Sequence, residues 1–116
     1  MRLTILLMVI LFAGCHDCEL PEVTCPTAET LDATPWLAEL KSSITDCTCE
    51  ISIIQATYKG ETVFYKGMTD ALCNGINIPI LYNCSGTVVK SFTDSAADQA
   101  DLKNISIVEV LYRCQK

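Results

Sequence analysis

Eight cysteines in 116 residues constrain this chain more than any other feature. Such a density is typical of chains that fold in an oxidising compartment and are held together by disulfides. Each disulfide closes a loop and so limits the folds that a small domain can adopt. The eight positions are Cys15, Cys18, Cys25, Cys47, Cys49, Cys73, Cys84 and Cys114.

The start of the chain indicates how the protein reaches such a compartment. Arg2 is followed by an uncharged, mostly apolar run that ends at Gly14. The run is shorter than the about 20 apolar residues that span a bilayer, and its layout is that of an export signal. Leu11-Phe12-Ala13-Gly14-Cys15 resembles a bacterial lipobox, in which the thiol of the cysteine receives a diacylglycerol. Phe12 departs from the leucine that is usual at its position in this motif.

We therefore predict that residues 1–14 are a lipoprotein signal peptide and that Cys15 is the lipidation site. The lipid would anchor the exported protein to the bacterial outer membrane, on its periplasmic or cell-surface face. The alternative is an ordinary signal peptide, with Cys15 in a disulfide. If Cys15 is lipidated, an odd number of cysteines remains. One of them is then free or bonded to another molecule, or the pairing differs between copies of the protein.

The spacing of the cysteines gives two expectations about their pairing. Cys47 and Cys49 lie on the same side of any strand, because side chains alternate between its faces. We expect them to bond two different partners rather than each other. Cys18 and Cys25 could close a small loop. The rest of the connectivity stays open.

The chain divides into three parts. After the signal peptide, residues 15–33 contain prolines, acids and threonines with little apolar periodicity, which is typical of a flexible tether. Residues 34–116 form a single domain. Its first segment, "TPWLAELKSSI", predicts a helix with Pro35 at the first helical position and an apolar face that includes Leu37 and Leu40.

Five strands and a second helix are predicted in the rest of the domain. "CEISIIQATYKGETVFYKG" predicts a hairpin that turns at Lys59-Gly60, and "IPILYNCSGTVVKSF" predicts a second one. "TDSAADQADLKN" predicts a short helix capped by Asp94, and "ISIVEVLYRC" a last strand that is apolar enough for a central position. The expected fold is α+β and disulfide-stapled: about five mostly antiparallel strands, an N-terminal helix, and a short helix before the last strand, with the helices on one face.

These segments together resemble a family of small uncharacterised lipoproteins from Bacteroidota-type bacteria. The resemblance lies in "TPWL", "ISIIQATYKGETVFY", Cys73-Asn74 and "LYNCSG", and it covers roughly residues 34–92 and the lipobox. It implies a place in the cell envelope and no catalytic residues.

Catalytic and metal-binding groups are scarce. The one histidine, His16, lies beside the anchor cysteine, so triads that need a histidine are excluded. Asp94, Asp98 and Asp101 fall on neighbouring helical positions and could bind Ca²⁺ loosely, but a solvated helix face is the favoured interpretation. Among the aromatic residues, Trp36 and Tyr58 are the ones to test for exposure in a ligand groove. We predict no catalytic residue, no cofactor and no metal.

The predicted function is that of a non-enzymatic cell-envelope lipoprotein, acting as a binding or structural module for a protein or glycan partner. The net charge of −6 argues against nucleic acid. One alternative is an inhibitor of a host or competitor hydrolase, which would use the loop 68–77 clamped by Cys73. A second alternative is a thiol-disulfide or metal-binding protein that uses Cys47 and Cys49. That alternative requires both thiols to be reduced.

Overall fold

A computed structural model describes residues 23–73 and 78–115 of the chain, so that the predicted signal peptide and lipidation site, together with His16 and Cys18, lie outside the described residues. In chain order, the elements are α1 (Pro35–Ser42), β1 (Ile51–Tyr58), β2 (Glu61–Met68), β3 (Ile80–Tyr82), β4 (Val88–Ser91), α2 (Ala96–Asp101), the 3-10 turn η1 (Leu102–Asn104) and β5 (Ile105–Cys114).

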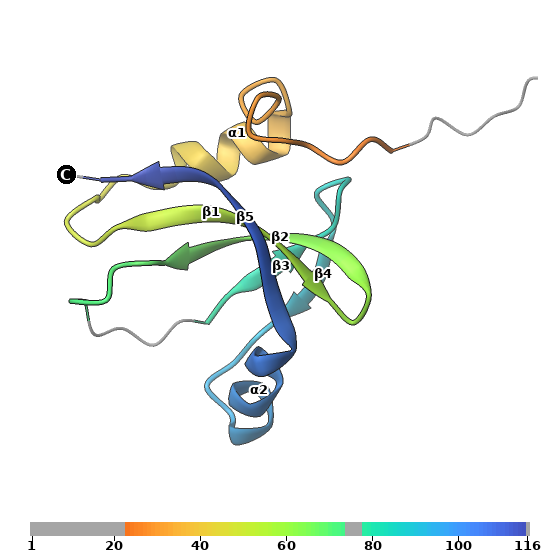
Figure 1. Cartoon of the computed structure of the whole chain (residues 1–116), viewed down its shortest axis with the longest axis vertical. Coiled ribbons are helices and arrows are strands. Elements are labelled where there is room, and N and C mark those ends of the chain that lie inside the picture. Colours follow the sequence, from red (N-terminus) through yellow and green to blue (C-terminus); the bar gives the residue numbers. More distant parts are fainter. Residues whose placement is uncertain (1–22, 74–77, 116) are drawn as a thin grey trace, which may run out of the picture.

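The strands form one antiparallel sheet in the order β4-β3-β2-β1-β5 (Figure 1). The predicted α+β fold is therefore confirmed, with the short helix directly before the last strand. None of the helices within residues 23–73 and 78–115 is long and apolar enough to cross a membrane.

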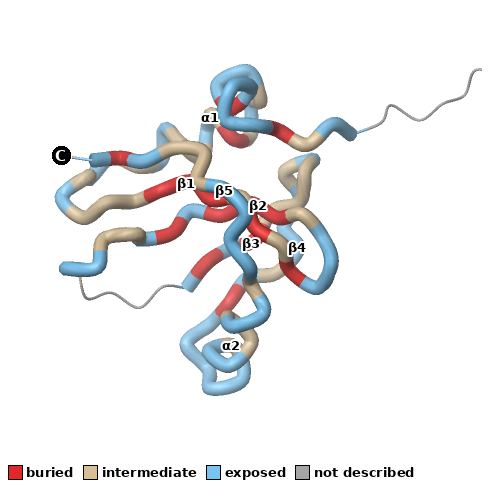
Figure 2. The backbone as a smooth tube through the Cα atoms, viewed as in Figure 1, coloured by how far each residue is buried: buried red, intermediate tan, exposed pale blue. Residues whose placement is uncertain are grey.

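The two helical segments lie on opposite faces of the sheet, whereas one shared face was expected. Ile53 and Ile54 are neighbours in β1 and point to opposite faces. Ile53 packs in a cluster with Leu37 of α1, and Ile54 belongs to a second cluster against which Leu102 of η1 packs. Each face of the sheet thus has its own small core, and the buried residues follow the middle strands β1 and β2 (Figure 2).

The last strand, β5, is an edge strand, and the prediction of a central position was wrong. It pairs only with β1 in the sheet order. Ile107 and Val108 remain 61% and 60% exposed. Two register shifts interrupt the pairing with β1, and such bulges are common at sheet edges. Its β-branched residues favour an extended backbone, but edge and central strands both have this backbone, so the composition does not distinguish the two positions.

Part of the predicted tether belongs to the folded domain. Leu31 is buried in the cluster with Leu37 and Ile53, and Cys25 is bonded to Cys84. Residues 25–33 were expected to be flexible because they show no apolar periodicity. A buried leucine, one disulfide and an ion pair between Asp32 and Lys41 hold them without such a pattern.

Three disulfides join the described cysteines. Cys47 bonds Cys114 and Cys49 bonds Cys73, with Cα atoms 5.4 and 6.0 Å apart. This confirms that Cys47 and Cys49 take different partners, and it removes the reduced pair that the thiol-disulfide and metal alternative required. Cys25 bonds Cys84 rather than Cys18, so the small loop suggested between Cys18 and Cys25 does not form.

Candidate functional site: a groove between α1 and β3

A groove runs between helix α1 and the outer half of the sheet. Its larger compartment has a volume of about 440 Å³, and a smaller compartment of about 130 Å³ adjoins it. Leu40, Lys66 and Tyr82 line both compartments, so the two lie side by side along the groove. The larger volume lies in the range of ordinary ligand-binding sites.

One side of α1 forms the helical wall of the groove. Trp36, Leu40 and Ser43 line it, and their spacing of four and three residues places them on the same side of a helix. Glu39 lies beside them at the larger compartment. Leu37 points into the core instead, which fixes the side of the helix that faces the groove.

The floor of the groove is formed by side chains of β2 and β3. Phe64 and Tyr82 are register partners and therefore share a face, and Lys66 and Ile80 lie two residues from them on that same face. Ile80 remains 41% exposed and Ile78, before it, 43% exposed. The smaller compartment is therefore mainly aliphatic, while the larger one is part aromatic and part polar.

The end of the groove is closed by the turn between β3 and β4. Asn83 Oδ1 accepts hydrogen bonds from the backbone N–H of Ser85 at 3.0 Å and of Thr87 at 3.0 Å. At Gly86, where φ is +84°, a Cβ atom would lie only 2.5 to 2.8 Å from the Cγ, Cδ1 and Cδ2 atoms of Trp36. These three similar distances place Gly86 over the five-membered ring of the indole. The disulfide from Cys84 holds this turn to residue 25.

Trp36 is consequently surrounded rather than open. Its ring centroid lies 5.8 Å from that of Phe64, in an edge-on arrangement, and 5.8 Å from that of Tyr82. Gly86 covers one face of the indole. Trp36 is half-buried and lines the groove, whereas Tyr58, the other aromatic candidate, is buried in the opposite core.

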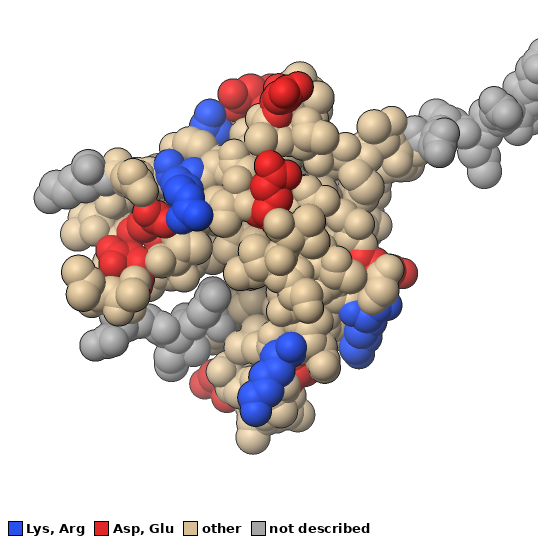
Figure 3. Space-filling model, viewed as in Figure 1, with Lys and Arg blue, Asp and Glu red and all other residues tan. Residues whose placement is uncertain are grey.

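Lys66 gives the groove a positive charge that lacks a counter-ion. Its Nζ donates to Ser43 Oγ at 3.3 Å, and among the described residues no carboxylate lies within 4 Å of it. Lys41, Lys90 and Arg113 each form an ion pair, with Asp32, Asp98 and Glu50 respectively, whereas Lys59 and Lys103, like Lys66, form none among the described residues. On the face shown in Figure 3, most basic side chains lie next to acidic ones.

The three aspartates considered for Ca²⁺ do not gather into a site. Asp98 accepts hydrogen bonds from Thr93, and these bonds together with the Lys90 ammonium lower the pKa of its carboxyl to about 2. Asp101 accepts from the hydroxyl of Tyr58, which lowers the pKa of this carboxyl as well. The helix cap is Ser95, whose side chain accepts from the backbone of Asp98, and not Asp94 as predicted.

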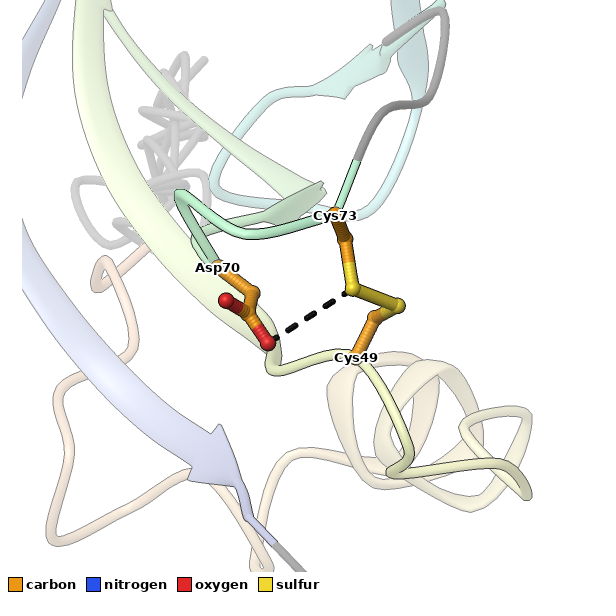
Figure 4. A group of neighbouring side chains, drawn as sticks. All are labelled: Cys49, Asp70 and Cys73. Atoms are coloured by element: carbon orange, nitrogen blue, oxygen red, sulfur yellow. Dashed lines mark hydrogen bonds between the residues drawn. A yellow bond between two sulfur atoms is a disulfide. The ribbon is translucent and has the colours of Figure 1, made fainter.

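Cys49, Asp70 and Cys73 form the one group of potential metal ligands within the described part of the chain (Figure 4). Metal binding needs thiolates, and both sulfur atoms are bonded to each other here. Asp70 Oδ2 lies 3.6 Å from Cys73 Sγ, but a disulfide sulfur carries no proton to donate. We interpret this contact as structural.

The same aspartate orders the turn that follows β2. Asp70 Oδ1 accepts from the backbone N–H of Leu72 at 3.0 Å, and its carbonyl accepts from Cys73 N–H at 3.2 Å. Leu72 at the tip is 93% exposed. Of the loop 68–77 predicted as an inhibitory loop, residues 74–77 lie outside the described part of the chain.

Comparison with known proteins finds no matching family model, curated protein or solved structure. The interpretation of the groove therefore rests on its geometry alone. Sequence reasoning pointed to Trp36 but did not find Lys66, Ile80 or Gly86. The alternation of Ile78, Ile80 and Tyr82 was the available signal, because it indicates an apolar face of β3 without indicating what covers it.

Proposed function

We propose that this protein is a non-enzymatic, lipid-anchored protein of the bacterial cell envelope that binds a protein or glycan partner in the groove. The observation that carries the proposal is Lys66, a cation without a counter-ion among the described residues, in a groove that is otherwise largely apolar and aromatic. Binding sites combine apolar lining with a few placed polar groups in this way.

The pairing of the cysteines supports the anchor. The six described cysteines bond one another, so the fold does not require Cys15 in a structural bond. Of the two other cysteines, Cys15 and Cys18, Cys15 is the one that ends the lipobox-like sequence. The resemblance of the preceding residues to a lipobox, and of the domain to small envelope lipoproteins, favours the same location.

The path of the chain would place the groove near the membrane. Cys25 is bonded to the turn that closes the groove, and Cys15 lies ten residues before it in the sequence. Because an extended chain spans at most about 3.6 Å per residue, this distance limits the groove to about 36 Å from the anchor. The partner would thus be met close to the bilayer surface.

The groove residues favour binding over catalysis. Ser43 and Lys66 touch, and a serine–lysine pair can act as nucleophile and base only if the lysine loses its proton. That loss requires a buried amine, whereas Lys66 is exposed and donates to the hydroxyl. We therefore assign Lys66 a role in holding an anionic group.

The anchor is tested by the intact mass of the protein from membranes of the producing cell, alkylated without reduction. We expect a chain that begins at Cys15, carries acyl groups and has at most one alkylated thiol. Cys15→Ser should release the protein from the membrane fraction, while Ser42→Ala, an exposed change of similar size, should leave it there. An unacylated wild-type chain would refute the anchor.

The groove is tested by screening the full-length protein in detergent against displayed random peptides and an array of glycans. At least one class should bind, and Ile80→Asn should abolish this binding without unfolding the protein, because Ile80 is already partly exposed. Val108→Asn, on the far edge strand, is the matched control. Binding that survives Ile80→Asn would place the partner elsewhere.

Inhibition of a hydrolase is a second candidate function, and Leu72 favours it. The turn that presents Leu72 is clamped at Cys73 by the disulfide to Cys49 and at Thr69 by Glu50 and Ser52. A rigid, exposed apolar side chain can enter a partner's pocket with little loss of entropy. Leu72→Asp should then abolish inhibition of peptidases with an apolar primary pocket, whereas Leu72→Met should retain it. Failure of the wild-type protein to inhibit any enzyme of this class would end the idea.

A further inference from the structure

The residues that line the groove indicate which kind of partner it fits. The inference drawn from them rests on the proposed binding function. We propose that the occupant is a short protein segment in which an acidic side chain lies between two apolar ones. The acidic group would meet Lys66, and the apolar side chains would enter the two compartments on either side of it.

The arrangement of the two compartments gives this order. Lys66 lines both of them, so this residue lies where they adjoin, and its ammonium is 3.3 Å from Ser43 Oγ on the helical wall of the larger one. Since Lys66 has no carboxylate partner within the described residues, an anion brought by a ligand would be paired there without displacing an internal one. Charge complementarity of this kind sets specificity more than affinity.

The smaller compartment selects an aliphatic side chain. Leu40, Ile78 and Ile80 line it together with Tyr82 and the stem of Lys66. Among the described residues, no acidic side chain is part of this lining. Filling the compartment would cover isoleucine surface that is exposed in the free protein, and removal of such surface from water favours binding in proportion to its area.

The larger compartment favours an apolar side chain with polar surroundings. Trp36 and Tyr82 provide aromatic surface, and Ser43 and Glu39 line its helical wall. The carboxylate of Glu39 would repel a second acidic group, as would the net charge of −6 of the whole chain. One acid, placed at Lys66, is therefore the charge pattern that this groove accepts.

A glycan is disfavoured by the position of the indole. Sugar rings stack on open aromatic faces, and Gly86 covers one face of Trp36 while Phe64 and Tyr82 pack against the ring. The isoleucines of the smaller compartment offer no hydrogen bonds to hydroxyl groups. The groove is better matched to amino-acid side chains than to a polyhydroxylated ligand.

The test is a selection of random peptides displayed on phage against the full-length protein in detergent. We expect enriched peptides to share an Asp or Glu flanked by apolar residues. Lys66→Glu should weaken their binding at least about tenfold, and a peptide with Lys in place of its acid should bind this variant better than the wild type. Lys103→Glu makes the same charge change on an exposed turn away from the groove and should leave the affinity unchanged.

Two results would overturn the inference, and they differ in what they say about the groove. Peptides that lose binding with Ile80→Asn but not with Lys66→Glu would retain the groove as the binding site and refute the acidic motif. Binding only to glycans, lost with Ile80→Asn, would likewise refute a peptide occupant. If neither peptides nor glycans bind in a way that depends on Ile80, the proposed binding function fails as well.

Discussion

The two β-hairpins of this protein have the same connectivity but are stabilised differently. The β1–β2 hairpin pairs eight residues on each strand without a register shift, from Ile51↔Met68 to Tyr58↔Glu61. The β3–β4 hairpin has strands of three and four residues and contains a register shift. Its turn is covered by Trp36 and tied to Cys25 by a disulfide, whereas a Cβ atom added at Gly60, in the turn of the long hairpin, would have no neighbour within 4 Å.

The difference separates a hairpin that is held by its own pairs from one that is held from outside. Long strands gain from many cross-strand contacts, while short strands gain few. The contacts that hold the short hairpin also build the groove, because Trp36 packs against Tyr82 and Gly86 and all three residues line the groove. Stability and the binding site should therefore be coupled in the β3–β4 hairpin and independent in the β1–β2 hairpin.

Among the changes that compare the two hairpins, the largest effect is expected from removing the disulfide that ties down the short hairpin. Cys25 and Cys84 are separated by 59 residues, and loss of a link over such a loop costs about 4 kcal/mol in the free energy of unfolding. The disulfide at the base of the long hairpin, Cys49–Cys73, closes 24 residues and should cost about 3.5 kcal/mol. Urea unfolding of the two double serine variants measures both.

The fluorescence emission of Trp36 in the groove should distinguish these two variants more clearly than their stabilities do. In the variant without Cys25–Cys84 the emission of Trp36 should shift, because the turn that covers the indole is released. In the variant without Cys49–Cys73 it should not. Equal shifts would show that the turn is not held from outside.

The next effect separates the two turn glycines. Gly60 and Gly86 have φ values of +81° and +84°, so alanine costs about 1 kcal/mol of backbone strain at either position. Gly86→Ala also drives a methyl group into Trp36 and should cost about 3 kcal/mol in total. Gly60→Ala meets no atom and is the matched control. Thermal unfolding that gives the same loss for both would contradict the packing of Gly86 on the indole.

Acid should weaken both hairpins through one carboxylate each. The carboxylate of Glu50 accepts hydrogen bonds from Thr69, which follows β2, and from Arg113 of β5. Hydrogen bonds to this carboxylate, the one from Thr69 contributing most, lower its pKa from 4.5 to about 2. Asp98 binds Lys90 of β4, and its pKa is lowered from 3.8 to about 2. Because both carboxyls are more acidic in the folded state, their contributions are complete above pH 4.5 and 3.8 and are lost as the pH falls toward 2.

Melting temperatures between pH 7 and pH 2 test these signs. The wild-type value should fall below pH 4.5. Glu50→Gln should flatten the fall that begins there, and Asp98→Asn the part that begins near pH 3.8. A wild-type melting temperature that rises on acidification would contradict both assignments.

The smallest expected effect is an increase in stability from a substitution in the turn of the long hairpin. Lys59 and Gly60 both have positive φ, as a type I′ turn requires, and asparagine tolerates this conformation better than lysine. Lys59→Asn should therefore stabilise the protein by about 0.5 kcal/mol, after the loss of the contact between its ammonium and the Tyr58 ring. Urea unfolding should show this gain with no change in the emission of Trp36. A loss of stability would mean that the ring contact outweighs the backbone strain.

The same two hairpins show what sequence reasoning can reach. The long hairpin and its Lys59-Gly60 turn were predicted because alternating β-branched residues and the turn residues are neighbours in the chain. The short hairpin was placed correctly within "IPILYNCSGTVVKSF", but its strands, Ile80–Tyr82 and Val88–Ser91, cover only part of that segment. Trp36 and Cys25, which hold its turn, are remote in sequence, so local patterns could not assign them to it.

The groove could not be predicted from the sequence for the same reason. Trp36 was named as a residue to test for exposure in a ligand groove, but no local pattern indicates which part of the sheet its helix covers. The edge position of β5 and the placement of the two helices on opposite faces depend likewise on how distant segments meet. The pairing of Cys47 and Cys49 with separate partners was predicted from strand alternation, although both residues precede β1 and do not lie in a strand.

The most direct test of the groove uses the one tryptophan of the chain as its reporter. Trp36 lines the groove, so a titration of the full-length protein with a selected peptide that lacks tryptophan should shift its emission to shorter wavelength as water is excluded. The shift should saturate at the dissociation constant that calorimetry gives for the same peptide. Saturable binding in the calorimeter with unchanged Trp36 emission would contradict the groove as the binding site and place the partner on another surface, such as the Leu72 turn or the β5 edge.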